Sequence, residues 1–239
     1  EKDRLYLSGY WGVDKFKFAN ERGTFKADIP WGNKTATFRW NHQFNAKLFA
    51  NTTLVYNDYN FASNFNQNNF SIKIASGIRD YNAKTDFDYY ASNNHHFKSG
   101  LAYTYHKFIP NQVSGQIDTI QLDPNNAFVK YAHETGLYIL DDFDAARWLK
   151  INIGLRYSWF GQVGPYTAYT RDFNGNNIDS TKYEKGQPIK SYGGWEPRFN
   201  TRFVLNDVSS LKTSISRTYQ YLHLVSNNGT TLPTDVWVP

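Results

Sequence analysis

Apolar and polar residues alternate along most of the chain, and the helical spacing of three or four residues is nearly absent. In the segment 149–159, the odd positions hold Leu, Ile, Ile, Leu, Tyr and Trp, and the even positions hold Lys, Asn, Gly, Arg and Ser. Successive side chains of a β-strand point to opposite faces, so this segment has one apolar and one polar face. The same pattern recurs in 37–41, 96–106, 199–205 and 211–216. It predicts an all-β protein.

We predict about nine antiparallel strands, joined by connections that are alternately short and long. The predicted strands cover residues 4–18, 34–44, 47–61, 69–90, 95–108, 128–143, 148–160, 191–205 and 209–222. The short connections are 44–46, 92–94, 144–146 and 206–208, and the long ones are 19–33, 62–68, 109–127 and 161–190. Tight turns at one end and long loops at the other are typical of a transmembrane β-barrel. Several strands exceed the roughly 9–11 residues that a tilted strand needs to cross the bilayer, so we expect them to project beyond it.

One of these strands changes phase along its length. Between residues 70 and 78 the apolar residues mostly occupy even positions, and between 81 and 89 they mostly occupy odd positions. A shift of one residue near Arg79 and Asp80 predicts a β-bulge, because a bulge inserts one extra residue into one strand. Alternation is also less regular between residues 131 and 143.

Composition excludes several classes of protein. The chain has 239 residues, 18% of them aromatic, with no Cys and no Met. Disordered chains are poor in aromatic residues, and disulfide scaffolds, zinc fingers and thiol enzymes need Cys. No apolar run approaches the roughly 18 residues of a membrane-spanning helix. The sequence begins at Glu1 without a start Met or signal peptide, so we expect it to be part of a longer polypeptide.

Aromatic residues gather near the ends of the predicted strands. On strands we interpret them mainly as interfacial girdles, where the rings lie at the level of the lipid headgroups. In loops, stacking against a ligand such as a glycan is equally compatible with the pattern. The residues predicted to bind ligand lie in the loop 161–195 and at the next outer rim; they are Tyr166, Tyr169, Phe173, Tyr192, Trp195, Tyr221, His223 and Asn227.

The chain is basic, with a formal net charge of +5 and a pI of about 9.1. Lys and Arg occur singly rather than in a basic run, so nucleic acid is not among the predicted partners. Charge that faces a barrel lumen or lipopolysaccharide explains the excess.

The segment 172–179 is rich in oxygen ligands and resembles a calcium-binding loop. Its glycine stands at a different place from the one in that motif, and the closing Glu is missing, so a polar turn is the favoured interpretation. The candidate calcium ligands are Asp172, Asn174, Asn176 and Asp179. The six histidines lack metal-binding spacing, and the common nucleophile and phosphate-binding motifs are absent. We therefore predict no enzyme activity and no cofactor.

Four short segments in the last hundred residues or so carry a family resemblance. The segment 149–157 is similar to a barrel strand of the form L-x-L-x-x-G-L-R-Y, and Glu196-Pro197-Arg198 is similar to the E-P-R that opens a later strand. The segment 214–220 resembles the strand S-x-S-R-x-x-Q, and 232–239 resembles the loop that follows it. In this order and spacing, the motifs resemble those of TonB-dependent receptors of the outer membrane, especially the type found in Bacteroidetes.

The resemblance implies a 22-stranded barrel with an N-terminal plug, located in the cell outer membrane. It implies nutrient import driven by the inner-membrane proton gradient through TonB, which would contact an N-terminal part absent from this chain. Other implied partners are outer-membrane lipid, lipopolysaccharide and a surface lipoprotein. We expect residues 1–239 to form part of one transmembrane β-barrel domain, without the plug and the C-terminal strands. The two outermost strands should therefore pair with strands outside this chain.

Two other functions fit the same strand pattern. One is a passive channel or a scaffold subunit of an envelope complex, which an upstream plug domain and TonB box would exclude. The other is a soluble β-sandwich or carbohydrate-binding module, which would have polar outer faces on both sheets. The regular apolar face on so many strands argues against the sandwich.

Overall fold

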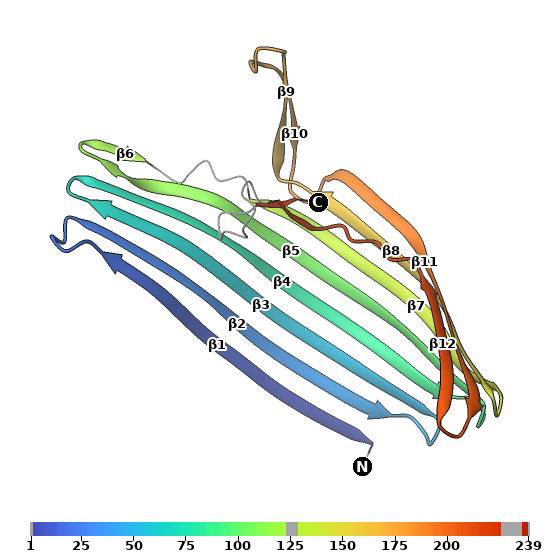
Figure 1. Cartoon of the computed structure of the whole chain (residues 1–239). Coiled ribbons are helices and arrows are strands. Elements are labelled where there is room, and N and C mark those ends of the chain that lie inside the picture. The colour runs from blue at the N-terminus through green and yellow to red at the C-terminus, as the bar shows by residue number, and fades with distance from the viewer. Residues whose placement is uncertain (1, 123–128, 226–235, 239) are drawn as a thin grey trace.

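The computed structural model describes residues 2–122, 129–225 and 236–238. Its main feature is one antiparallel sheet in which each strand pairs with the next along the chain, in the order β1-β2-β3-β4-β5-β7-β8-β11-β12, with β6 also on β5 (Figure 1). This confirms the all-β antiparallel prediction. β1 and β12 lie at opposite edges, so the described residues form an open, curved wall rather than a closed barrel.

The strands of the main sheet are long. Their bounds are β1 (Asp3–Ala19), β2 (Phe25–Gln43), β3 (Leu48–Gln67), β4 (Phe70–Tyr90), β5 (His95–Ile117), β6 (Ile120–Leu122), β7 (Lys130–Ala146), β8 (Leu149–Val163), β11 (Pro188–Asn206) and β12 (Ser209–Ser216). Two separate hairpins pair β9 (Tyr166–Arg171) with β10 (Asn177–Tyr183) and β13 (His223–Val225) with β14 (Val236–Val238). No helix in the described part of the chain is long and apolar enough to span a membrane.

The predicted short turns are close to their expected places, but two of the predicted long loops are wrong. β1 and β2 are joined by residues 20–24 only, and β3 and β4 by residues 68–69. The residues expected in these loops instead extend the strands, so the hairpins of β1–β5 rise as paired backbone beyond the other strands (Figure 1).

The other two predicted long loops also contain strands. In the range 109–127, β5 continues to Ile117 and turns back into β6. The range 161–190 contains the hairpin β9–β10, which projects away from the sheet (Figure 1). The last predicted strand is too long, because β12 ends at Ser216 rather than at residue 222.

The β-bulge predicted at Arg79 is also misplaced. The pairing of β3 with β4 continues without a shift through that position. A shift occurs instead between β4 and β5, where Ala75 pairs with Gln112 and Gly77 pairs with Ile109. Pro110 and Asn111 of β5 therefore lie opposite a single residue of β4, and Pro110 has no N–H to join the ladder.

The sheet has two distinct faces. We call the side on which Tyr221 packs against Phe160 the inner face, and the opposite side the outer face. Directly paired residues of antiparallel strands point to the same side, so the register assigns each strand position to a face. One cluster of buried apolar side chains lies on the inner face. It is small, since one layer of sheet offers little interior, and it consists of Phe108, Ala132 and Phe160, with Ile78, Tyr221 and Leu222 packed against them.

Candidate functional site

A polar network fastens the segment after β12 to the inner face. The Ser158 hydroxyl donates to Glu196 Oε1 at 2.5 Å and lies 2.8 Å from the Tyr221 hydroxyl, which donates to the Ser158 carbonyl oxygen at 3.1 Å. The Tyr221 ring stacks on Phe160, with centroids 5.7 Å apart. Glu196 is buried, and Arg156 Nε lies 3.9 Å from its Oε2. These contacts bring β8, β11 and residue 221 together.

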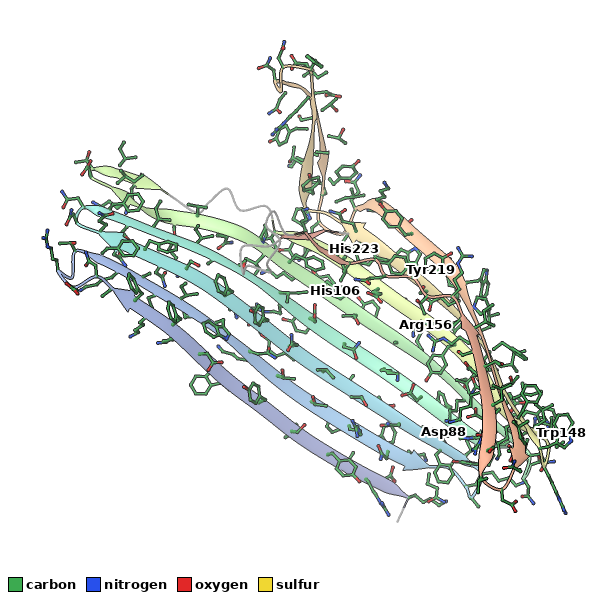
Figure 2. All side chains as sticks on the ribbon, in the orientation of Figure 1. Asp88, His106, Trp148, Arg156, Tyr219 and His223 are labelled. Carbon is green, nitrogen blue, oxygen red and sulfur yellow. The ribbon has the colours of Figure 1, made fainter. Side chains whose placement is uncertain are left out.

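A second polar cluster lies beside the apolar core. The imidazole of His106 is buried, with Nδ1 2.8 Å from Asp80 Oδ1 and Nε2 3.5 Å from Glu134 Oε2. Its ring stacks on that of Phe108 at 5.5 Å between centroids. Figure 2 shows His106 near the middle of the sheet, whereas Trp148 lies at the end with the short turns. The inner face thus places charged and hydroxyl groups next to aromatic rings, with the buried groups paired to one another.

Seven of the eight predicted ligand-binding residues divide into three groups. Tyr166, Tyr169 and Phe173 lie on the projecting hairpin, where Phe173 is fully exposed at the tip. Tyr192 and Tyr221 both adjoin Phe160 on the inner face, Tyr192 as its register partner in β11. His223 begins β13, and Asn227 lies outside the described residues.

Trp195 lies on the opposite face of the sheet from Tyr192 and Tyr221. It belongs to β11, within the predicted strand 191–205. It pairs with Tyr157 on the outer face, and the two rings lie 4.9 Å apart. This position is typical of a lipid-facing aromatic residue.

The candidate calcium loop is organised by its own hydrogen bonds. Asp172 Oδ1 accepts from the backbone N–H groups of Asn174 and Asn176, at 2.9 and 2.8 Å, and Oδ2 accepts from Asn176 Nδ2 at 3.1 Å. The Asn176 side chain, followed by the backbone N–H groups, lowers the pKa of Asp172 below its ordinary value. Asp179 Oδ1 accepts from the Ser180 N–H at 2.7 Å. In the described chain, no group of three or more His, Cys, Asp or Glu residues is placed to hold a metal ion.

The outer face carries two aromatic rows. Tyr56, Tyr81 and Tyr105 form the tyrosine row on β3, β4 and β5, with ring centroids 5.3 and 6.3 Å apart. Near the short turns, Tyr89 stacks on Phe97 at 6.5 Å. Along both β4 and β5 the rows are eight residues apart, about 26 Å along the strand. Tilt reduces this to a height of about 20 Å, close to the apolar band of a membrane barrel.

Exposed apolar side chains fill the space between these rows. They include Leu7, Phe38, Leu54, Leu101, Leu137, Ile139, Ile153 and Leu155. Residues 3–234 match the family model described as TonB dependent receptor-like, beta-barrel. The chain belongs to this family. Membership confirms the resemblance found in the motifs, and receptors of this family are located in the outer membrane of Gram-negative bacteria.

Solved structures support the same fold for this TonB-dependent receptor segment. The closed form of the ferric-catecholate import receptor Fiu from E. coli K12 has a TM-score of 0.59 at 12% identity, over 90% of this chain and 41% of that one. The open form of Fiu has a TM-score of 0.53 at 13% identity, over 80% and 36%. The chain therefore spans less than half of these receptors, and the likeness concerns the fold. A comparison with curated protein sequences finds no match.

Sequence analysis missed several residues of the inner face. Ser158, His106 and Glu134 occupy polar positions of alternating strands, which is the one signal that marks them. Their partners are far away along the chain; Ser158 is 38 residues from Glu196 and 63 from Tyr221. Only the register of the sheet brings such residues together.

Proposed function

We propose that this chain forms part of the barrel wall of an outer-membrane receptor that imports a nutrient by TonB-dependent transport. The observation that carries the proposal is the apolar outer band between two aromatic rows, in a chain that matches the receptor-barrel family from residue 3 to 234. A wall of this kind separates lipid on its outer face from a polar lumen on its inner face. The proposed location of the receptor is the cell outer membrane.

The ligand, in this proposal, meets aromatic residues in two places. Tyr169 and Phe173 on the exposed hairpin make the first contact, and Tyr192, Tyr221 and His223 lie further in. Exposed aromatic rings beside hydroxyl and carboxylate groups favour a ligand with flat or ring-shaped parts and several hydrogen-bonding groups. No catalytic residue is needed for this role.

Two partners follow from the same proposal. TonB would act through an N-terminal part outside this chain. A surface lipoprotein would have the projecting hairpin as its natural contact, because Phe173 and Ile178 are exposed there on a hairpin that stands clear of the sheet (Figure 1).

Uptake of labelled nutrients by cells that make the full receptor polypeptide tests the proposal. We expect uptake in cells with TonB and none in cells without it. The double variant Tyr192→Ala/Tyr221→Ala should reduce uptake about tenfold or more at limiting nutrient, because stacking surface is lost. Tyr103→Ala, an exposed outer-face tyrosine, is the matched control and should retain uptake.

Other outcomes separate the alternatives. Uptake that is independent of TonB would identify a passive channel, and a receptor that imports nothing while remaining in an envelope complex would identify a scaffold. Either result would overturn the proposal of active transport.

A further inference from the structure

The half of β11 that adjoins the hairpin β9–β10 has a neighbouring strand on one side only. β8 pairs with β11 from Pro188 to Phe203, whereas β12 pairs with it only from Arg198 onward. In the described part of the chain, no strand lies beside residues 188–196 on the other edge. Figure 1 shows that the chain leaves the sheet after β12 and crosses β8 instead. A free strand edge presents unpaired N–H and C=O groups, which are a template for another strand.

The segment 217–222 directly follows β12 and matches this free edge in register. The last bond of the β12 ladder runs from the Arg217 N–H to the Pro197 carbonyl oxygen, at 3.1 Å. Continued by two residues, the same register sets Tyr219 beside Trp195. The segment could therefore extend β12 along the free edge without any shift in pairing.

The residues of the segment also have the polarity of a wall strand. In the extended register, the odd positions share the outer face with Trp195 and hold two tyrosines. The even positions face inward and begin with Thr218 and Gln220. On the outer face the rings of Tyr157 and Trp195 are 4.9 Å apart, and Tyr219 would be the next ring beside them.

In the structure, however, the segment lies on the inner face. The Tyr219 ring stacks on Tyr221 with centroids 6.0 Å apart, and Tyr221 stacks in turn on Phe160. The Tyr219 ring also lies over Gly194, where an added Cβ would come within 2.4 Å of it. The Tyr221 hydroxyl bonds to the Ser158 carbonyl oxygen. These contacts are made by side chains, in a part of the described chain that belongs to no strand.

Backbone pairing is weak at the point where the two paths divide. In an antiparallel ladder Arg217 and Pro197 would exchange two hydrogen bonds, but proline has no N–H and returns none. Gly193 and Gly194 lie next along the free edge, and glycine weakens the interior of a strand. Leaving the ladder after Arg217 therefore costs little.

We infer that the segment 217–222 exchanges between two positions. In the lumen position, described above, Tyr221 covers Phe160, which is 0% exposed. In the strand position, the segment extends β12 along the free edge of β11, gains the ladder bonds there and uncovers the inner face around Phe160. The exchange couples completion of the wall to access to Tyr192 and Phe160. To that extent it rests on the proposed function, which assigns this part of the inner face to the ligand.

Cysteine cross-linking of the full receptor in liposomes tests the inference. In the strand position, residues 191 and 223 form a hydrogen-bonded pair with Cα atoms about 5.5 Å apart, within reach of a disulfide. In the lumen position the sheet separates them, because Ser191 pairs with Gly161 on the outer face and the segment lies on the inner face. Under mild oxidation, Ser191→Cys/His223→Cys should form a disulfide at a slow but measurable rate, followed by peptide mass spectrometry.

Two substitutions that weaken only the lumen position should speed this cross-link. Gly194→Ala places a methyl group against the Tyr219 ring and should raise the rate about tenfold. Tyr221→Phe keeps the stacked ring but removes the hydroxyl contacts with Ser158, and it should raise the rate about fivefold.

Gly12→Ala is the matched control, because a Cβ there would also meet a tyrosine ring, that of Tyr10, on the distant strand β1. It should leave the rate unchanged. Equal rates in Gly194→Ala and this control would leave the lumen position as the only one and overturn the inference. Immediate and complete cross-linking in the unsubstituted background would make the strand position permanent, which overturns it equally.

The pair Gly193→Cys/His223→Cys is out of register by two residues and should remain unlinked in every background. If it links as readily as the first pair, the segment is disordered rather than shared between two positions, and the inference fails. Cross-linking is measured without nutrient, so its failure leaves the transport proposal standing. Failure of TonB-dependent uptake would leave the two positions of the segment standing.

Discussion

The lower and upper parts of the same strands turn opposite faces to their surroundings. In the lower wall, between the tyrosine row and the short turns, apolar residues such as Leu54 and Leu101 point outward and polar residues point inward. In the upper wall, formed by β1–β5 beyond that row, lysine and asparagine point outward. Its inner face carries Phe16, Phe18, Phe25, Ile29, Trp31, Phe61, Phe65, Phe70, Ile72, Ile74, Ile78 and Phe108.

The reversal shows that face polarity follows the medium rather than the strand. In the lower wall, lipid outside and water inside favour an apolar outer face and a polar inner face. In the upper wall, water outside and packed side chains inside favour a polar outer face and an apolar inner face. Phe61 is 4% exposed and Phe108 is 5% exposed, so the upper inner face already buries part of its surface. The level at which the faces exchange roles marks the outer edge of the membrane in this wall.

The largest effect that would break this comparison comes from an arginine placed midway between the two aromatic rows. Leu101 is exposed on the outer face of β5, four residues from both Phe97 and Tyr105. Leu101→Arg should lower the free energy of unfolding in lipid bilayers by about 2–4 kcal/mol, because a charge at the bilayer midplane loses its hydration. Urea unfolding of the full receptor in liposomes measures this change.

Ser114→Arg on the same strand is the control for the upper wall. Ser114 pairs with Lys73 on the outer face, which we place in water, so its replacement should change the free energy of unfolding by less than about 1 kcal/mol. Equal costs at both positions would contradict the assignment of lipid to one and water to the other.

The phase change of β4 shows what sequence alone can and cannot establish here. The alternation of apolar and polar residues identified the strands, because the two faces of a single-layer sheet meet different surroundings and successive residues alternate between them. The change of parity near Arg79 was interpreted as a bulge, yet the backbone there is regular and only the medium changes. A shift of the backbone and a shift of the surroundings produce the same pattern of residues, so the sequence could not distinguish them.

The same ambiguity explains the two long loops that were predicted and are absent. Residues 25–33 and 62–67 were predicted as loop, yet they belong to β2 and β3 and carry polar residues such as Lys26, Asp28 and Asn64 on the outer face. The inner-face network was beyond prediction for a different reason. Glu196 was noted within a motif, but its contacts with Ser158 depend on the pairing of β8 with β11.

A smaller change in the free energy of unfolding is expected at Asp58, where the lower wall meets the upper wall. Asp58→Asn removes the buried carboxylate that accepts from Arg79 and Tyr56, and it leaves the partly exposed Arg79 guanidinium without its charge partner. The free energy of unfolding should fall by about 1–2 kcal/mol, since charge-assisted bonds of buried groups contribute this much. Glu184→Gln is the control, because the Lys182–Glu184 pair is highly exposed and should contribute close to nothing. A neutral outcome for Asp58→Asn would mean that Asp58 does not stabilise the tyrosine row.

The smallest effect concerns the hairpin β9–β10, which forms a two-stranded sheet separate from the lower and upper walls. Its tip depends on local hydrogen bonds to Asp172, whose pKa is lowered mainly by the Asn176 side chain. A carboxyl group with a lowered pKa stabilises the turn above its unfolded pKa of about 4, and this contribution is lost as the pH falls through the lower folded value. We expect amide hydrogen exchange at Asn174 and Asn176, taken as the ratio of wild type to Asp172→Asn, to show extra protection at pH 6 that is lost as the pH falls below the ordinary carboxyl pKa and through the lowered folded value. The ratio cancels the intrinsic pH dependence of exchange. A ratio that stays constant across this range would mean that the turn does not depend on the carboxylate. Backbone pairing alone would then determine the conformation of the hairpin tip, as it does for the strands of the wall.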